Sequence, residues 1–305
     1  MIFTHPSCFE HDMGEGHPES PARLAVVVDA LQQPRFQGIE WRRAPTATVQ
    51  QLLRVHDRSL IDRVFNSAPS DGYHRLDPDT AMNRCSLQAA LHAAGAAVAA
   101  VEAVLAGTSP RAFCAVRPPG HHATRFDAMG FCLFNNIAVA AAHALHRGIA
   151  RLAIVDFDVH HGNGTQDIFA EEPRVLFVSS HQYPLYPGSG DPDEHGIGNI
   201  FNAGLMVGAR SLEFRETWLN LLLPAVEAFA PELILVSAGF DAHRLDPLAQ
   251  LNLQTEDYAW ITERIVEIAE RHADGRVVSS LEGGYSLTAL RESVGAHCAA
   301  LFDLD

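Results

Sequence analysis

The chain has 305 residues, and its composition excludes several classes of protein. Hydrophobic residues make up 47% and charged residues 19% of the sequence, which is typical of a compact globular chain and not of a disordered one. Lys and Arg together number 22 against 37 Asp and Glu, so the formal net charge is −15. Such a charge repels phosphate backbones and anionic lipid headgroups, and we expect no direct binding to nucleic acid.

We expect neither a membrane segment nor a second domain. A membrane helix needs an apolar run of roughly 20 residues, and we expect none in this sequence. Residues 1–10 lack the basic start and the apolar stretch of a signal peptide. The five cysteines show no CxxC spacing, which argues against a disulfide framework and against a thiolate zinc site. We therefore expect a cytoplasmic protein with one domain over residues 1–305.

Short β-branched runs alternate with longer segments of helical period, which is the pattern of an α/β fold with a mainly parallel sheet flanked by helices. The elements that we predict, in chain order, are strand 2–4, helix 21–32, helix 86–106, strand 112–116, helix 135–147, strand 152–156, strand 174–178, helix 212–230, strand 232–237, helix 256–272, strand 276–281 and helix 287–301. The alanine-rich segment 89–104 is expected to pack closely on other helices or on the sheet. Two tracts, 68–83 and 181–205, are rich in Gly, Pro, Asp and Tyr and are expected to be irregular loops.

A set of metal-ligating residues follows two of the predicted strands. Strand 152–156 runs into Asp156, Asp158 and His160, which alternate onto one side of an extended chain. Asp241 follows strand 232–237, at the same edge of a parallel sheet, and completes a set of one imidazole and two carboxylates. Three protein ligands of this kind are typical of catalytic zinc, with iron or cobalt as alternatives. The other interpretation is that the aspartates only cap the next segment, but packed acids without a cation would repel one another.

Two further patterns follow predicted strands. His121 and His122 come after strand 112–116 in the segment RPPGHH, where the prolines and the glycine hold adjacent imidazoles in fixed directions, as acid–base catalysis requires. Tyr285 ends the segment EGGY after strand 276–281, and a turn at the two glycines would bring its phenol over the metal, where it can donate to an oxyanion. Each pattern alone is more often structural, so the common sheet edge is what favours a site.

Taken together, segments 117–122, 156–164, 237–241 and 282–285 resemble the signature motifs of the histone deacetylase family, which includes bacterial histone deacetylase-like amidohydrolases and acetylpolyamine amidohydrolases. The resemblance begins near residues 16–23, continues through 130–136 and covers most of the chain, and it is strongest with the class II-like branch. It implies the arginase/deacetylase fold, a single α/β domain with a mainly parallel sheet of about eight strands. Within the first motif, residues 17–19 are expected to form a structural turn anchored by Arg23.

The resemblance also implies roles for individual residues. The expected zinc ligands are Asp158, His160 and Asp241. The expected catalytic residues are His121, His122 and Tyr285, with Asp156 orienting His121. The expected structural potassium site is formed near Asp156, Asp158, His160, Ser179 and Ser180. The acyl-lysine channel is expected to be lined by Gly130, Phe131 and Tyr186, with Leu248 at a mouth position where polyamine-selective members tend to carry an acid.

One residue departs from the common family pattern. Asn163 stands where many members have an aspartate as the partner of His122, and a neutral amide is expected to leave that histidine with a lower pKa and a larger neutral fraction. The alternative is that Asn163 only bonds the loop backbone. We expect His122 to act as the general base.

These residues predict a zinc-dependent amidohydrolase that acts on an acylated amine, with acyl-lysine in proteins or peptides preferred over acylpolyamines. The same pocket would serve an acetylpolyamine deacetylase or a noncatalytic acyl-ligand sensor. A ureohydrolase of the related arginase architecture would need two adjacent metals and more acidic ligands than the motifs supply.

Overall fold

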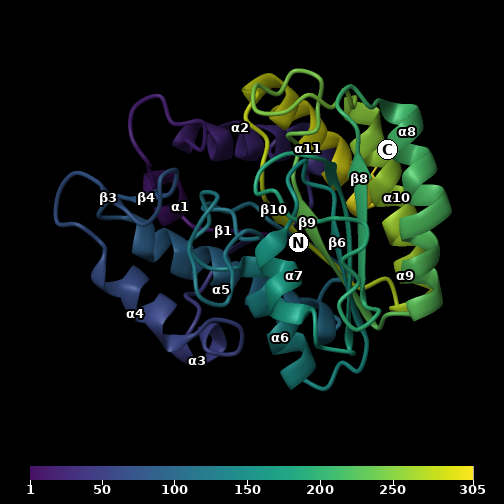
Figure 1. The fold of residues 1–305 in the computed structure, drawn as a ribbon, viewed down its shortest axis with the longest axis horizontal. Coiled ribbons are helices and arrows are strands. Elements are labelled where there is room, and N and C mark those ends of the chain that lie inside the picture. Colours follow the sequence, from purple (N-terminus) through teal and green to yellow (C-terminus); the bar gives the residue numbers. More distant parts are fainter. Residues whose placement is uncertain (305) are drawn as a thin grey trace.

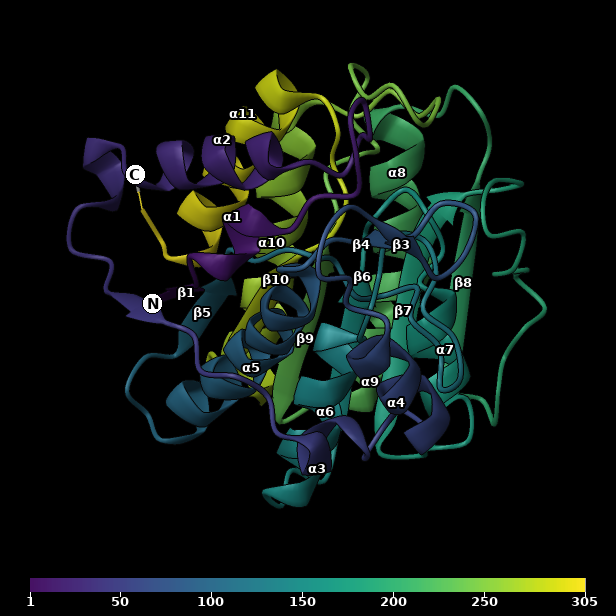
Figure 2. The same cartoon turned by 90° about the vertical axis from the view of Figure 1, so that its left-hand side faces the viewer.

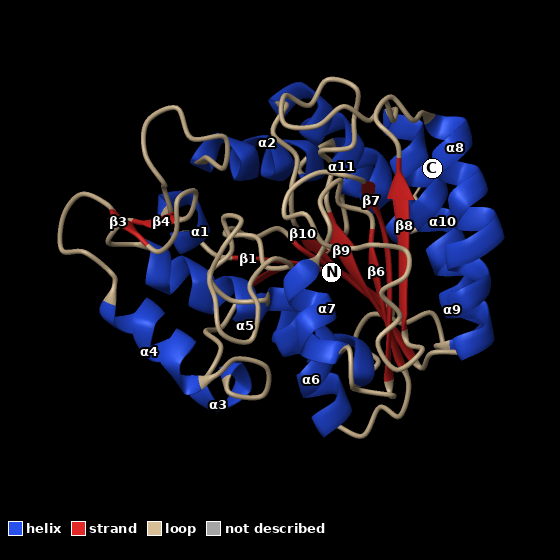
Figure 3. Cartoon of the chain, in the orientation of Figure 1, coloured by secondary structure: helices blue, strands red, loops and turns tan. Residues whose placement is uncertain are grey.

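The computed structural model describes residues 1–304 and is built around one parallel β-sheet (Figures 1 and 3). Its eight strands lie in the order β2-β1-β5-β10-β9-β6-β7-β8. Their bounds are β1 Ile2–Thr4, β2 Trp41–Arg43, β5 Arg111–Cys114, β6 Leu152–Asp156, β7 Val175–Gln182, β8 Ile200–Leu205, β9 Leu233–Ala238 and β10 Val277–Leu281. A separate antiparallel pair is formed by β3 His74–Arg75 and β4 Ala81–Met82.

Helices cover both faces of the sheet (Figure 1). On one face lie α8 Ser211–Thr217, α9 Leu223–Phe229 and α10 Thr255–His272, with α11 Leu287–Leu301 packed between α10 and α2 Pro21–Leu31 (Figure 2). On the other face lie α5 Ser86–Leu105 and α6 Asn136–His146, which pack against each other and against the central strands. The shorter helices are α1 Ser7–Glu10, α3 Val49–Leu52, α4 Arg58–Asn66 and α7 Asn163–Phe169, with a 3-10 turn at Pro34–Phe36.

Helix α5 corrects the expectation that the sequence holds no apolar run long enough for a membrane helix. It is long and apolar enough to cross a membrane, with a mean hydropathy of 1.4 over its most apolar window, but 72% of that window is buried inside the protein. Small residues let it approach its neighbours closely, as predicted for the alanine-rich segment. A Cβ added at Gly95 would lie 2.0 Å from the carbonyl oxygen of Pro45. α5 is therefore a helix of the hydrophobic core.

Most predicted elements are present, and the differences have physical reasons. Strands β1 and β6 and helix α11 have the predicted bounds, and most other ends differ by one or two residues. The helix predicted at 212–230 is divided by a π-helical turn at Trp218–Leu222. Strand β7 extends to Gln182 and β8 lies inside the tract 181–205 that we expected to be irregular. β2 and β8 are the edge strands, and their polar or small residues lack the apolar pattern of a buried strand.

Candidate metal and catalytic site

The candidate site lies where four neighbouring strands end. β5, β10, β9 and β6 are adjacent in this order and parallel. Their carboxyl ends therefore share one edge, where open α/β sheets place their sites. The segments after these strands carry the residues singled out in the sequence, which are His121 and His122 after β5, Tyr285 after β10, Asp241 after β9, and Asp158 and His160 after β6.

Asp158, His160 and Asp241 form the one group of three metal-ligating side chains found among residues 1–304. One ligand atom from each lies within 4.8 Å of the others. Nδ1 of His160 is 3.2 Å from Oδ1 of Asp158 and 3.1 Å from Oδ2 of Asp241. All three side chains are buried, and the described chain places only imidazoles, and no arginine, in ion-pair distance of the two carboxylates.

This cluster fits a divalent cation. Burial raises the pKa of Asp241, and the nearby Asp158 carboxylate raises it further, because two carboxylates buried close together repel each other when both are ionised. The carboxylates of Asp158 and Asp241 fit here only because two residues beside them, Gly239 and Gly283, have no side chain. A Cβ at Gly239 would lie 2.0 Å from Oδ2 of Asp158, and one at Gly283 would lie 2.0 Å from Oδ2 of Asp241. The donor set, one imidazole and two carboxylates, suits zinc or a similar ion.

The two adjacent histidines have different partners. Nδ1 of His121 lies 2.9 Å from Oδ2 of Asp156, and Nδ1 of His122 lies 2.7 Å from Oδ1 of Asn163. Burial opposes the protonation of His121, but the nearby carboxylates, Asp156 first and then Asp158, together outweigh it and raise the pKa of His121 to about 10. Burial, and then the charge of His121, lowers the pKa of His122 well below its usual value. The pair therefore holds one charged and one neutral imidazole, the arrangement that separates acid from base roles.

Tyr285 is held in place by its backbone and by an arginine. Its backbone N–H donates to Oδ2 of Asp246 at 2.7 Å. The guanidinium of Arg23 lies 4.9 Å from the centre of the phenol ring and donates to the carbonyl of Gly284 at 2.6 Å. Burial raises the pKa of Tyr285 well above its usual value. The side chain therefore stays a phenol that can donate a hydrogen bond.

A cavity of about 210 Å³ joins these groups. Its lining residues are Asp79, His122, Gly130, Phe131, His160, Leu185, Tyr186, Leu248 and Tyr285. The rings of Phe131 and Tyr285 meet edge to face with centres 5.8 Å apart, and those of His122 and Tyr186 meet in the same way at 5.2 Å. The four residues that we expected to contact substrate all lie on this wall, although their roles stay predictions.

Gly130 shows why this loop cannot carry another residue. Its φ is +56°, and a Cβ there would lie 2.4 Å from Cδ2 of the His122 ring. The loop therefore passes directly against the imidazole, which only glycine allows.

Sequence reasoning did not predict Asp79 as a wall residue. It lies in the tract 68–83, where Oδ1 of Asp77 accepts the backbone N–H groups of Asp79 and Thr80 at 2.8 and 2.7 Å. The hydroxyl of Thr80 accepts the N–H of Phe131 at 3.0 Å and so ties this loop to the cavity. Burial and the Asp77 carboxylate raise the pKa of Asp79. The segment DPDT is a turn signal, but it does not indicate where the turn docks.

The predicted turn at residues 17–19 is present and is more strongly held than expected. The fully buried Glu19 pairs with Arg23 at 2.9 Å and with both Nε and Nη2 of Arg117. Arg117 also donates to the carbonyls of Cys8 and His11 at 2.9 and 3.0 Å. One buried network therefore connects the opening loop, the start of the histidine motif and, through Arg23, the turn that carries Tyr285.

The two serines of the expected potassium site lie on β7. Ser179 is the register partner of Asp156 on β6, and its Oγ lies 2.9 Å from Nδ1 of His181. Ser180 accepts a hydrogen bond from Nε1 of Trp218 at 3.0 Å. Ser179 is therefore next to the start of the metal motif, while both hydroxyls already have protein partners.

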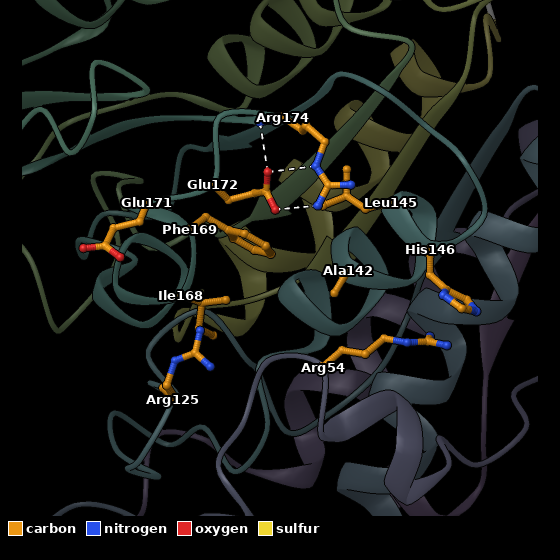
Figure 4. Close-up of a pocket in the computed structure, with 10 residues that line it drawn as sticks. All are labelled: Arg54, Arg125, Ala142, Leu145, His146, Ile168, Phe169, Glu171, Glu172 and Arg174. Carbon is orange, nitrogen blue, oxygen red and sulfur yellow. Dashed lines mark hydrogen bonds and ion pairs between the residues drawn. The ribbon is translucent and has the colours of Figure 1, made fainter.

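A larger hollow lies elsewhere in the molecule. It measures about 650 Å³ and is lined by Arg54, Arg125, Ala142, Leu145, His146, Ile168, Phe169, Glu171, Glu172 and Arg174 (Figure 4). Two of these residues neutralise each other, because Arg174 donates to Glu172 at 2.8 and 2.6 Å. Within residues 1–304, this hollow holds no group of metal-ligating side chains. Size alone therefore does not identify the site.

Comparisons with known proteins show the family of the chain. The histone deacetylase domain matches residues 17–301. The chain is 41% identical over 281 residues to a histone deacetylase-like amidohydrolase of Pseudomonas aeruginosa, covering 89% of this chain and 73% of the relative. It is 38% identical over 327 residues to histone deacetylase 14, chloroplastic, of Arabidopsis thaliana, covering 100% of this chain and 77% of the relative.

A solved structure is similar over nearly the whole chain. The HDA15 HD domain superposes with a TM-score of 0.93 at 33% sequence identity, covering 99% of this chain and 88% of that one. The eight-stranded parallel sheet with flanking helices is thus the arginase/deacetylase fold, as predicted from the motifs. The chain belongs to the histone deacetylase family.

Proposed function

We propose that the chain is a zinc-dependent amidohydrolase that removes an acetyl or other acyl group from an acylated amine, with acyl-lysine in peptides or proteins as the preferred substrate. The observation that carries this proposal is that one 210 Å³ cavity is lined by His160 of the ligand cluster, by His122 of the histidine pair and by Tyr285. Asp158, His160 and Asp241 would hold the metal ion. When bound, zinc polarises an acyl carbonyl and lowers the pKa of water towards 7.

The chain's own residues would then move the protons. Because Nδ1 of His122 is occupied by the side-chain oxygen of Asn163 at 2.7 Å, the neutral ring carries its proton there and leaves Nε2 free to accept one from the attacking water. The imidazolium that results can donate this proton to the leaving amine. His121, whose pKa is raised by the carboxylates of Asp156 and Asp158, would add positive charge beside the reaction. The products are a carboxylate and a free amine.

Tyr285 would stabilise the negative charge that develops on the acyl oxygen. Its phenol lines the cavity with His122 and His160, and Arg23 holds the turn that carries it. A preorganised donor of this kind commonly contributes about 3 kcal/mol to the stabilisation of the transition state.

The shape of the cavity supports a slim substrate stem. Phe131, Tyr186 and Leu248 give it a mainly apolar wall, which suits the alkyl chain of an acyl-lysine. Asp79 is the acidic group on that wall, and its carboxylate can accept N–H groups of a peptide backbone. The same carboxylate would attract the second ammonium of an acetylated polyamine, so acetylpolyamine deacetylation is the second candidate.

We also propose a structural potassium ion near the carboxyl ends of β6 and β7. Support comes from the register pairing of Asp156 with Ser179, which puts the segments 156–160 and 179–180 side by side. Loss of thermal stability on replacing potassium by a larger organic cation would support this site, and an unchanged melting temperature would contradict it.

The proposed reaction is tested by comparing acetate and amine release from an acetyl-lysine peptide, from longer acyl-lysine peptides and from N-acetylputrescine, with enzyme of measured metal content. The chain contains no lysine, so amines released from a lysine substrate are measured against a low background from the enzyme. We expect turnover that follows zinc occupancy and is highest with an acyl-lysine peptide. Turnover that does not depend on metal would contradict the proposal.

A further inference from the structure

Glu282 is a buried carboxylate that takes no part in the chemistry described above. It follows β10 and is fully buried. Its Oε2 accepts the backbone N–H groups of Gly120 and His121 at 2.6 and 3.2 Å. Its Oε1 lies 3.3 Å from Oγ of Ser237, which donates from the end of β9. One side chain therefore connects the histidine loop to the ends of two central strands.

The backbone around His121 is held from the opposite side as well. The carbonyl of His121 accepts the N–H groups of Gly164 and Thr165 at 3.0 and 3.2 Å. Gly120 has no room to move towards α6, because a Cβ there would lie 2.4 Å from the backbone nitrogen of Asn136. In the described structure, Glu282 is the acceptor of the two consecutive N–H groups, and without it both would be buried without a partner.

We propose that Glu282 is a positioning residue that fixes the direction of the His121–His122 pair. The centres of the two imidazole rings are only 4.0 Å apart, so a shift of the backbone at His121 moves the ring of His122 in the cavity. The inference rests on the proposed function, in which His122 must reach the attacking water. Glu282 is the first residue of the EGGY segment, and the proposed role concerns the geometry of a different loop, the one that carries the two histidines.

The two N–H groups need an acceptor oxygen, which a neutral amide supplies as well as a carboxylate. No arginine of the described chain pairs with the Glu282 carboxylate, and Arg23 instead binds the main-chain carbonyl of Glu282 at 2.5 Å. A glutamine has the same shape and keeps one oxygen that can accept both N–H groups, while its amide can donate to the Ser237 hydroxyl. An alanine removes both acceptors.

Two readouts on Glu282→Ala and Glu282→Gln test this role. In the metal-free protein, amide hydrogen exchange at Gly120 and His121 is expected to lose protection in Glu282→Ala and to keep it in Glu282→Gln. In the zinc-loaded enzyme, Glu282→Ala is expected to lower kcat by about 100-fold, as for a displaced catalytic group, with KM changed less than kcat. Glu282→Gln is expected to restore most of kcat.

Each outcome either supports or overturns the proposed role of Glu282. Unchanged exchange and unchanged kcat in Glu282→Ala would overturn the proposal, and so would a Glu282→Gln variant as impaired as the alanine variant. If Glu282→Ala does not fold, Ser237→Ala releases only Oε1 and is expected to weaken protection at the same two amides. An unchanged exchange pattern there would also overturn it. A wild-type protein without turnover would contradict the proposed function, while the exchange measurement would still decide the role of Glu282.

Discussion

Oδ1 of Asn163 lies 2.7 Å from Nδ1 of His122, so the second histidine of the pair has an amide as its partner where the first has the carboxylate of Asp156. An amide oxygen orients the ring and selects its tautomer without adding negative charge. Burial, and then the charge of His121, lowers the pKa of His122 well below its usual value, and the hydrogen bond to Asn163 does not offset this. The histidine that we assign as the base is therefore neutral at physiological pH.

Replacing Asn163 by Asp should move the acidic limb of the pH–rate profile. A carboxylate beside Nδ1 stabilises the imidazolium and raises the pKa of His122. Because the base must be neutral, activity is then lost at a higher pH than in the wild type, and the rate at pH 7 falls. The measurement is kcat/KM against pH for both proteins at equal zinc content. An acidic limb that stays in place would show that Asn163 only holds the loop.

Replacing Tyr285 by Phe should lower kcat by about 100- to 1,000-fold, the usual loss for one oxyanion donor, with little change in KM or in melting temperature. A matched control is Tyr258→Phe. The hydroxyl of Tyr258 is fully buried and has no hydrogen-bond partner in the described structure, so its removal should leave activity unchanged and stability equal or higher. Full activity of Tyr285→Phe would remove the phenol from the mechanism.

The predicted fold class and family are confirmed. Most residues that line the cavity could be predicted from the sequence because of one topological rule. Parallel strands end at the same edge, so polar residues that directly follow strands, such as Asp158 and Asp241, could be placed together without a structure. The position of Asp79 could not be derived in this way. Its loop contains only a pair of two-residue strands, and it is held by contacts such as the hydrogen bonds from the N–H of Phe131 to Thr80 and between the His17 ring and the carbonyl of Asp79.

Contacts between loops were also beyond the sequence. Glu282 was expected only as part of a tyrosine turn, because its partners, the N–H groups of Gly120 and His121, carry no side-chain signature. The edge strands β2 and β8 were missed for a related reason. One side of an edge strand lacks a pairing neighbour, and residues such as Arg42 and Asn202 need not follow the apolar pattern of a central strand.

Replacing Gly283 by Ala should remove the metal. The added Cβ would lie 2.0 Å from Oδ2 of Asp241 and 2.6 Å from Oδ2 of Asp158, and overpacking of this kind costs about 1–3 kcal/mol. Zinc per chain is expected to fall from near one towards zero. Gly295→Ala in α11 is the matched control, since nothing lies within 4 Å of its added Cβ, and it should bind zinc normally. Normal zinc binding by Gly283→Ala would contradict the assignment of Asp241 as a ligand.

Replacing Asp79 by Asn should separate the two substrate classes. The amide keeps an acceptor oxygen for peptide N–H groups but loses the negative charge, so KM for an acetyl-lysine peptide should rise only slightly. N-acetylputrescine carries a free ammonium, and its KM should rise by about tenfold if it uses this carboxylate, as expected for loss of roughly 1.4 kcal/mol. The measurement is KM and kcat for both substrates.

Asp77→Asn is the charge-matched control for this comparison. Asp77 holds the same loop through two backbone N–H groups but does not line the cavity, so its amide variant should leave both KM values close to those of the wild type. If Asp79→Asn behaves like Asp77→Asn, the carboxylate does not contact either substrate. If the wild type prefers N-acetylputrescine and only Asp79→Asn abolishes that preference, the cavity is built for a polyamine and not for acyl-lysine.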